Sequence, residues 1–218
     1  MDSNKSRTAK TALRVAVAPQ RRHGKERVAT LLEVGGTVIA EKGYEAATMA
    51  EIAERAGSPI GSLYRFFPNK DLLAEALIQR YATQIDEEFA RITARAKISA
   101  IAEIVDALLD FTVNRRSETK VIIALLEARS DLSARRLEFR KSILKHITET
   151  LTLLAPALPA PLGKDMAVIL FHNMKLMKAL KFQPNIPTTP GAVEELRRMN
   201  RLYVADRLAE FRKKTGTK

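Results

Sequence analysis

Residues 48–72 constrain the fold more than any other part of the chain. Thr48 and Glu51 have the spacing of a capping box, in which the Thr48 hydroxyl accepts the N–H of Glu51 and the Glu51 carboxylate accepts the N–H of Thr48. The apolar residues that follow share one face of a helix: Met49, Ile52, Ala53 and Ala56. The pattern predicts a short helix that begins after Thr48.

A second short helix follows a tight turn. Gly57 suits the positive φ of such a turn, and Ser58-Pro59 reads as a cap followed by proline at the first helical position. Leu63 and Phe67 lie four residues apart and predict the buried side of this helix. The outer side is predicted to carry Ile60, Gly61, Ser62 and Arg65. Two short helices joined in this way are typical of a helix-turn-helix DNA reader.

The residues after this turn make the pattern specific. Pro68 ends the second helix, and Asn69 caps a third that has Lys70 in its first turn. Over about residues 24–75, the chain resembles the TetR family of bacterial transcription regulators. The most specific part of the resemblance is Ile60-Gly61-Ser62-Leu63-Tyr64 followed by Phe67-Pro68-Asn69-Lys70.

The resemblance implies a role for each matching position. Thr48, at a helix N-terminus, touches a phosphate, and Tyr64 and Lys70 bind phosphates that set the register on DNA. The base edges of the major groove meet Pro59, Ile60, Gly61 and Ser62. Arg65 stands where the family varies, and its guanidinium can grip a phosphate or a guanine edge. The family usually has an apolar residue at 58 and serine at 59, so Ser58-Pro59 moves the expected cap back by one residue.

Charge adds a second argument for DNA. The net charge is +12, and residues 1–25 carry seven basic side chains against Asp2 alone. A basic arm ahead of a DNA reader can neutralise phosphates and reach the adjacent minor groove. We expect residues 1–23 to form such an arm and Arg21, Arg22 and Lys25 to contact DNA. For residues 1–12, a solvated tail is an equally good interpretation.

The sequence pattern predicts further helices in the rest of the chain. Helices are expected over about 25–42, 69–95, 98–114, 118–129, 133–155, 164–181 and 189–214. In the helix from Ser133, Leu137 is expected in the buried stripe. With the two short helices, this predicts an all-α chain of about nine helices. Residues 24–84 form the DNA-binding domain and residues 85–218 a larger domain for effector binding and dimerisation.

The helix over 164–181 is apolar on more than one face and therefore needs two partners. A core on one side and a subunit interface on the other satisfy it. The resemblance implies dimerisation through the last two helices. The expected interface residues are Val168, Phe171, Leu176, Leu196 and Tyr203.

Candidates for an effector pocket are few. His146 and His172 can point into one, although satisfied surface or partly buried histidines are the plainer interpretation. Met174 and Met177 can line a pocket or fill the core. No histidine has the company of a zinc site, and Asp106 and Asp110 read as a solvated face.

Other functions find little support. The chain has no cysteine, no glycine-rich phosphate loop and no Gly-x-Ser-x-Gly elbow, so neither a cofactor nor an enzyme activity is expected. The start lacks the apolar core of a signal peptide and no apolar run reaches about 18 residues, which predicts a cytoplasmic protein with no membrane partner.

The sequence thus predicts a homodimeric regulator of double-stranded DNA, a repressor released from a near-palindromic operator by a small apolar or aromatic, and in one alternative anionic, effector. A ligand-independent repressor or an activator of the same fold stays open. Outside this class, the rivals are an architectural DNA-binding protein and an enzyme that degrades small molecules.

Overall fold

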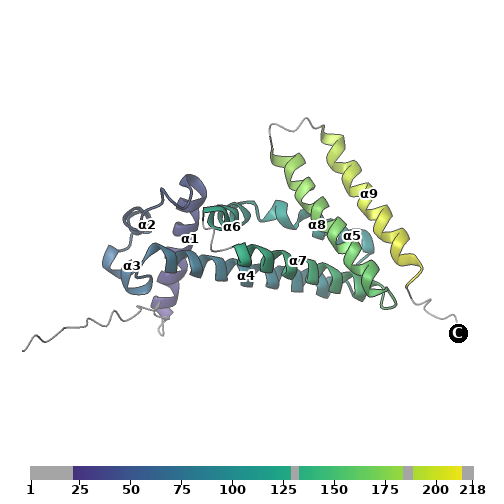
Figure 1. Ribbon diagram of the computed structural model, residues 1–218, viewed down its shortest axis with the longest axis horizontal. Coiled ribbons are helices and arrows are strands. Elements are labelled where there is room, and N and C mark those ends of the chain that lie inside the picture. Colours follow the sequence, from purple (N-terminus) through teal and green to yellow (C-terminus); the bar gives the residue numbers. More distant parts are fainter. Residues whose placement is uncertain (1–21, 129–132, 184–188, 213–218) are drawn as a thin grey trace, which may run out of the picture. The chain divides into compact units, whose positions relative to one another are not determined.

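The structure is a computed structural model that describes residues 22–128, 133–183 and 189–212. These residues form nine helices and no strand (Figure 1), so the prediction of an all-α chain is confirmed for the described part. The chain divides into two compact units after Leu77, inside the helix that links them. The sequence had suggested a boundary after residue 84. Residues 1–21 of the expected arm, Arg21 among them, lie outside the described residues, whereas Arg22 and His23, also expected in the arm, begin the first helix.

Unit 1 holds α1 (Arg22–Lys42), α2 (Met49–Arg55), α3 (Ile60–Phe66) and the start of α4 (Lys70–Arg95). Its core side chains are fully buried: Leu31, Val38, Ile39, Ile52, Leu63 and Leu73. Close packing explains why glycine stands at position 35 inside α1. A Cβ added there would lie 3.3 Å from Leu73 Cδ2 and 3.7 Å from Ile52 Cγ2. The missing side chain lets α1 approach α2 and α4 closely.

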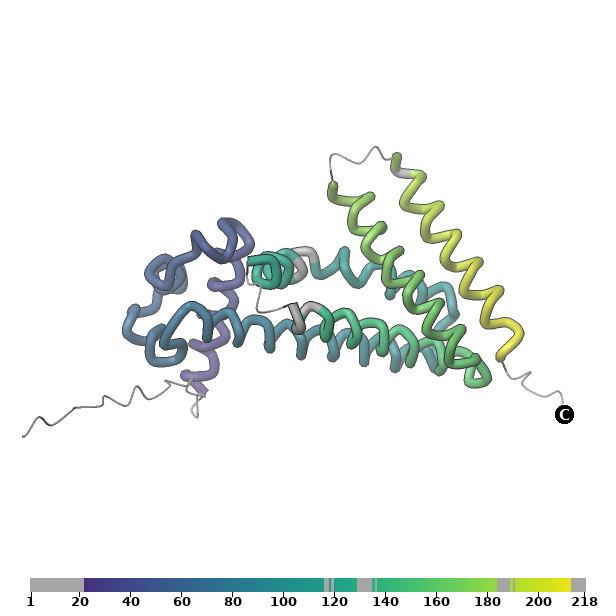
Figure 2. The backbone as a smooth tube through the Cα atoms, viewed as in Figure 1, coloured from purple at the N-terminus to yellow at the C-terminus, as the bar shows by residue number. Residues whose placement is uncertain are grey.

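Unit 2 holds the rest of α4 with α5 (Ile101–Asn114), α6 (Arg116–Ala128), α7 (Ser133–Leu154), α8 (Ala160–Phe182) and α9 (Pro190–Ala209). Helix α8 packs against α5 and α7, and α8 and α9 run side by side (Figure 2). Residues at the centre are fully buried: Phe89, Leu108, Leu109, Leu151, Met174 and Met177. One apolar core therefore joins the helices of this unit.

Two boundaries or faces in unit 2 differ from the sequence prediction. Helix α8 begins at Ala160, not near 164, because proline is tolerated in a first turn and Gly163 fits against Leu158, whose Cδ2 would lie 3.3 Å from an added Cβ. Leu137 was expected in the buried stripe of α7, but its side chain is 51% exposed. The buried residues of α7 lie further along, at Ile147, Thr150 and Leu151.

Polar side chains join the helices of unit 2 at set positions. Asn173 Nδ2 on α8 donates to Asn200 Oδ1 on α9 over 2.8 Å, and Asn200 Nδ2 donates to the Leu196 carbonyl over 2.7 Å. Thr93 and Thr150 share a hydroxyl hydrogen bond of 2.9 Å between α4 and α7. Since a buried polar group without a partner is costly, such pairs favour one register of the helices over others.

Asp106 and Asp110 do not form the solvated face that the sequence suggested. Arg201 of α9 donates to both oxygens of Asp106, over 2.9 and 2.7 Å, and Arg197 Nη2 lies 2.5 Å from Asp110 Oδ1. The hydrogen bond that Arg197 donates to Asp110 raises the pKa of Arg197, and the hydrogen bond that Arg201 donates to Asp106 raises the pKa of Arg201. These half-buried pairs fasten α5 to α9.

Candidate nucleic-acid interface

The start of α2 forms half of the expected capping box. Thr48, with extended backbone, accepts the N–H of Glu51 on its hydroxyl oxygen over 3.2 Å. The Glu51 carboxylate instead lies 2.7 Å from Lys42 Nζ and 2.8 Å from Arg55 Nη2. The Glu51 carboxylate was expected to accept the N–H of Thr48. It pairs instead with the two cationic side chains.

Glu51 belongs to a chain of charges that joins α1 to α2. Arg55 Nη1 lies 2.6 Å from Glu41 Oε2, so Glu41, Arg55, Glu51 and Lys42 form one continuous network. The hydrogen bond from Lys42 is the main cause that lowers the pKa of Glu51, and the hydrogen bond to Glu41 is the main cause that raises the pKa of Arg55. The network fixes α2 against the C-terminal end of α1.

The turn between α2 and α3 ends the first helix by a defined motif. Gly57 has φ +57°, its N–H donates to the Glu54 carbonyl over 3.0 Å, and the Ser58 N–H donates to the Ala53 carbonyl over 2.9 Å. This paired closure is the Schellman arrangement, which needs a residue that tolerates positive φ. The role predicted for Gly57 is therefore observed.

Ser58 does not cap α3, contrary to the sequence prediction. Helix α3 begins at Ile60 with Pro59 at the N-cap position and no side-chain capping bond. The Ser58 hydroxyl is buried without a hydrogen-bond partner. Because the backbone N–H of Ser58 is used to close α2, its side chain is committed to the inside of the turn and cannot also serve α3.

Helix α3 separates a buried from a presented face. Leu63, Phe66 and Phe67 are buried in the core of unit 1. Ile60 and Tyr64 are 46% and 47% exposed, although large apolar side chains usually avoid water. Beside them the exposed or half-buried positions are Thr48, Pro59, Gly61, Ser62 and Arg65. The residues predicted to meet base edges, Pro59 to Ser62, are thus exposed or half-buried.

Lys70 makes contacts within unit 1 that the sequence did not reveal. Its ammonium donates to the carbonyls of Tyr44 and Glu45 over 2.8 and 3.0 Å and lies 4.4 Å from the centre of the Tyr44 ring. Tyr44 in turn donates its hydroxyl to Asp71 over 2.6 Å. An ammonium has three N–H groups, so one remains for a phosphate. Lys70 fastens the α1–α2 loop to the start of α4.

Of the basic residues predicted to contact DNA near the start of the chain, Arg22 and Lys25 lie in the first turn of α1. Arg22 pairs with Glu26 over 2.9 Å in a highly exposed position, and Lys25 is exposed. Such an i, i+4 pair at the surface is weak and can be exchanged for a phosphate at little cost. Arg21 lies outside the described residues.

The four effector candidates do not share one pocket. Met174 and Met177 are fully buried in the core of unit 2, and His172 is exposed with its ring edge-on to Phe171 at 5.5 Å. His146 stacks on Phe89 at 5.1 Å, with Nε2 at 2.8 Å from Asp86 Oδ1. None of the four lines the cavities described below. The sequence had no signal for the α4–α5 cavity, because its walls come from several helices.

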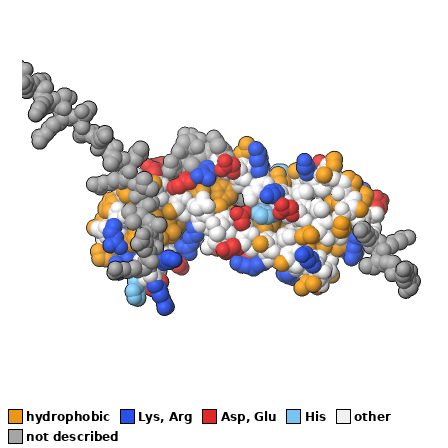
Figure 3. All heavy atoms as spheres, turned by 90° about the horizontal axis from the view of Figure 1, so that it is seen from below, with side chains coloured by type: hydrophobic (Ala, Val, Ile, Leu, Met, Phe, Trp, Pro, Cys, Tyr) orange, Lys and Arg blue, Asp and Glu red, His pale blue; other side chains and the backbone are white. Residues whose placement is uncertain are grey.

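The α8–α9 surface is apolar beyond the five residues expected at an interface. Val168 and Leu176 are exposed, and so are Ile169, Met199 and Leu202, with Leu202 62% exposed. Phe171 and Tyr203 are half-buried. Leu196 belongs to the core of the unit at 7% exposure, so its place in a predicted interface is wrong. Figure 3 shows hydrophobic side chains scattered among charged ones on the face that it draws.

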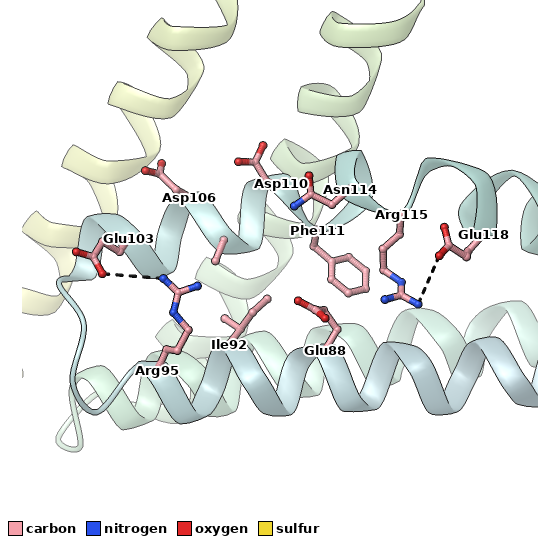
Figure 4. A pocket seen from close by; sticks show the side chains of 11 residues that line it. Glu88, Ile92, Arg95, Glu103, Asp106, Asp110, Phe111, Asn114, Arg115 and Glu118 are labelled. Atoms are coloured by element: carbon pink, nitrogen blue, oxygen red, sulfur yellow. Dashed lines mark ion pairs between the residues drawn. The ribbon is translucent and has the colours of Figure 1, made fainter.

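A cavity of about 550 Å³ lies between α4 and α5 in unit 2 (Figure 4). Glu88, Ile92 and Arg95 line it from α4, and Asp106, Asp110 and Phe111 line it from α5. An ion pair lies toward each end, Arg95–Glu103 at 4.0 Å and Arg115–Glu118 at 3.9 Å. Asp106 and Asp110 line this cavity and also hold α9, with their carboxylates pointing away from α4 (Figure 4).

Residues 22–128, 133–183 and 189–212 show neither a candidate metal site nor a candidate membrane span. No group of three or more His, Cys, Asp or Glu side chains there could hold a metal ion. No helix in that part of the chain is long and apolar enough to cross a membrane.

Known proteins resemble the chain in sequence and in fold. Residues 31–77 match the family model described as bacterial regulatory proteins, tetR family. The HTH-type transcriptional repressor KstR of Mycobacterium tuberculosis is 35% identical over 98 residues, 43% of this chain and 41% of the relative. The nucleoid occlusion factor SlmA of Haemophilus influenzae is 32% identical over 106 residues, 45% and 47%. The matches span less than half the length of these relatives.

The fold extends beyond the matched sequence. A transcriptional regulator from Aquifex aeolicus superposes with a TM-score of 0.65 at 19% identity, covering 81% of this chain and 99% of that one. This likeness concerns the arrangement of helices alone. The match of residues 31–77 to the family model, together with the helix-turn-helix geometry, confirms the expected resemblance to the TetR family of bacterial regulatory proteins.

Proposed function

We propose that the chain is a DNA-binding transcriptional regulator that inserts α3 into the major groove. The observation that carries the proposal is the presented face of α3, where Ile60 and Tyr64 are exposed while Leu63 and Phe67 anchor the helix. A rigid helix with accessible side chains on one side is the element that this groove admits. The match to the repressor KstR over 98 residues supports the same conclusion.

The residues divide into two kinds of contact. Pro59, Ile60, Gly61 and Ser62, in the first turn of α3, meet base edges and give sequence preference. Phosphates are held by Thr48, Tyr64, Lys70, Arg65, Arg22, Lys25 and Arg21. The third N–H of Lys70 makes its phosphate bond while the other two keep the α1–α2 loop in place.

The regulator acts as a homodimer through α8 and α9. The exposed apolar side chains Val168, Ile169, Leu176, Met199 and Leu202 support this surface. A two-fold dimer presents two copies of α3 to half-sites about 34–36 Å apart on a near-palindromic operator. Charged substitution of Leu176 or Leu202 should shift the dimer toward monomer in sedimentation.

A small-molecule effector releases the repressor from DNA by binding in unit 2. The α4–α5 cavity supports this step, because Ile92 and Phe111 supply apolar wall and Asp106 and Asp110 connect it to α9. Helix α4 lines the cavity and continues into unit 1. The ligand releases DNA only through unequal affinity for two arrangements, and operator DNA must weaken the ligand by the same factor.

The decisive experiment selects genomic fragments that the full chain binds and competes them with unrelated DNA. A preferred site with two-fold symmetry supports the regulator. Equal competition by unrelated DNA would support an architectural DNA-binding protein instead. The match to SlmA makes a nucleoid occlusion factor the second candidate, and binding sites spread along the chromosome away from promoters would favour it.

A further inference from the structure

An open groove of about 860 Å³ runs along unit 2 between α7 and the start of α8. We call it the α7–α8 groove. Its walls come mainly from one face of α7, with Lys164 and Val168 from α8 and Thr93 from α4. It shares no lining residue with the α4–α5 cavity. The groove is therefore distinct from that cavity, and it shares Val168 with the proposed α8–α9 interface.

The floor of this groove is apolar. Leu144, Leu153 and Val168 line it, and the latter two are each 42% exposed. Thr148 and Thr152 line it as well, but their hydroxyls donate to carbonyls of their own helix over 2.8 and 2.9 Å. The polar atoms of both threonines are thereby satisfied within α7, and the floor offers few hydrogen bonds to a ligand.

The rim carries an excess of positive charge. Lys141, Lys145 and Lys164 border the groove against a single carboxylate, Glu149. Lys145 Nζ lies 3.8 Å from Glu149 Oε1, in a highly exposed pair. Within the described part of the chain, neither Lys141 nor Lys164 makes an ion pair. Two ammonium groups are thus free to meet an anion at the edge of an apolar surface.

We propose that the α7–α8 groove binds an amphipathic anion, a long-chain carboxylate whose alkyl chain covers Leu144, Leu153 and Val168 while its head meets the lysines. A volume of about 860 Å³ lies within the range of about 300–1,000 Å³ that small-molecule sites occupy. An alkyl chain matches a floor without open donors, and a carboxylate matches an excess of ammonium groups.

A second copy of the chain fits this groove poorly. In a two-fold contact the same patch meets itself, so the rim lysines of one copy would approach those of the other. The exposed α8–α9 side chains Ile169, Met199 and Leu202 offer a surface without that repulsion. The proposal depends only on the residues that line the groove, so it holds whether or not the chain binds DNA.

The test uses the full chain and displacement of fluorescent cis-parinaric acid, itself a long-chain carboxylate. Dodecanoate, dodecanol and dodecyltrimethylammonium serve as competitors below their micelle concentrations. We expect dodecanoate to compete best, with dodecanol about tenfold weaker or more because it lacks the charge-assisted contact. From decanoate to tetradecanoate, each methylene should tighten binding about fourfold while it adds covered apolar surface.

Two sets of variants locate the site. Thr152→Trp fills the groove, and Thr83→Trp is its control, because Thr83 is an exposed threonine on α4 with the same backbone hydrogen bond to the residue four before. The rim triple Lys141→Gln, Lys145→Gln and Lys164→Gln is compared with a charge-matched triple at the exposed residues Lys97, Lys120 and Lys175.

Loss of binding of about tenfold or more in Thr152→Trp and in the rim triple, with both controls unchanged, establishes the site. Equal competition by dodecanol, or probe binding that neither variant alters, would overturn it. Thr152→Trp that lowers the sedimenting mass but keeps the probe would show that a second copy occupies the groove, which also overturns the proposal. Because operator binding is measured separately, failure here leaves the proposed regulator untouched.

Discussion

The helix-turn-helix region of unit 1 and the α4–α5 cavity of unit 2 are built in opposite ways. In unit 1, the bonds that start the helices join near neighbours: Thr48 accepts from Glu51, and Asn69 accepts from Leu72 over 2.8 Å. In unit 2, the bonds around the cavity join residues far apart in the sequence, such as Asp106 with Arg201. A local motif can be recognised from the sequence, whereas a cavity between helices depends on how those helices pack against one another.

The same contrast extends to the kinds of residue that are exposed. On α3, exposed Ile60 and Tyr64 lie at positions that the family resemblance marks for DNA. On α8 and α9, exposed Ile169, Met199 and Leu202 carry no motif, only apolar character. The exposure of an apolar side chain is therefore more informative about function where a local sequence pattern already assigns that residue a role.

The largest expected effect tests the face of α7, where sequence and structure disagree. Leu151→Ala should lower the free energy of unfolding by about 2–5 kcal/mol, because the side chain is fully buried. Leu137→Ala, on the same helix, should change it by no more than about 0.5 kcal/mol, because Leu137 is 51% exposed. Urea unfolding measures the free energy of unfolding of both variants. A comparable loss of stability in the two would show that Leu137 belongs to the buried face of α7, as the sequence predicted.

The second test addresses the ion pairs between α5 and α9. Asp106→Ala leaves Arg201 and Arg197 without one of their carboxylates in a half-buried position, and we expect a loss of about 1–3 kcal/mol of stability. Glu149→Ala is the control, since the exposed Lys145–Glu149 pair should contribute about 0–1 kcal/mol. Equal losses in chemical unfolding would mean that the α5–α9 pairs are ordinary surface pairs.

The third test separates sequence reading from phosphate holding on unit 1. Changes at Ile60 or Ser62 should alter the preferred base by about 1–3 kcal/mol per contact. Tyr64→Phe should weaken binding to operator and unrelated DNA alike and reduce the salt slope by up to about one. Binding titrations at several salt concentrations distinguish them. A changed base preference in Tyr64→Phe with unchanged overall affinity would contradict its phosphate role.

Lys70→Ala should have two effects rather than one. It removes a phosphate contact, and it also frees the Tyr44 and Glu45 carbonyls, so unit 1 should lose about 1 kcal/mol of stability as well. Unfolding and DNA titration of the same variant separate the two. DNA affinity that falls with no change in unfolding would show that the loop does not need this lysine.

Most of the fold follows from the sequence, because helix periodicity and caps are local. The boundaries of α1, α2, α4 and α5 agree with the expected ranges to within about three residues. Errors arose where two partners compete or where the partner is distant. Ser58 was assigned to α3 while its backbone closes α2, and Leu196 was placed outside although α9 turns it into the core.

The candidate sites divide along the same line. The positions proposed to contact DNA, from Thr48 to Lys70, lie within one short stretch and could be named from it. The α4–α5 cavity takes its walls from α4, α5 and the start of α6, so no single stretch marks it. His146 and His172 were chosen for chemistry alone, and chemistry without helix pairing could not tell a stacked surface histidine from a ligand contact.

A smaller effect concerns the pH dependence of unit 1. The pKa of Glu51 is lowered by its bonds to Lys42 and Arg55, so its ionised form stabilises the fold. That contribution is complete above the ordinary glutamate pKa and disappears as the pH falls through the lowered folded-state value. Glu51→Gln should therefore make stability less dependent on pH below about 4.5. Identical acid unfolding of variant and parent would leave the charge network without a role in stability.

The smallest effect decides between the two accounts of the turn. If Ser58 capped α3, as its sequence position suggests, Ser58→Ala would cost about 0.5–2 kcal/mol. In the structure its hydroxyl is buried without a partner, so the same change removes an unsatisfied polar atom and should leave stability unchanged or raise it by up to about 1 kcal/mol. Thr48→Ala is the matched comparison, because that hydroxyl does accept the N–H of Glu51 and its loss should cost about 1 kcal/mol. Thermal and urea unfolding of the two variants side by side measure the difference. A loss in Ser58→Ala equal to that in Thr48→Ala would place a cap on α3 after all and return the start of the reading helix to residue 59.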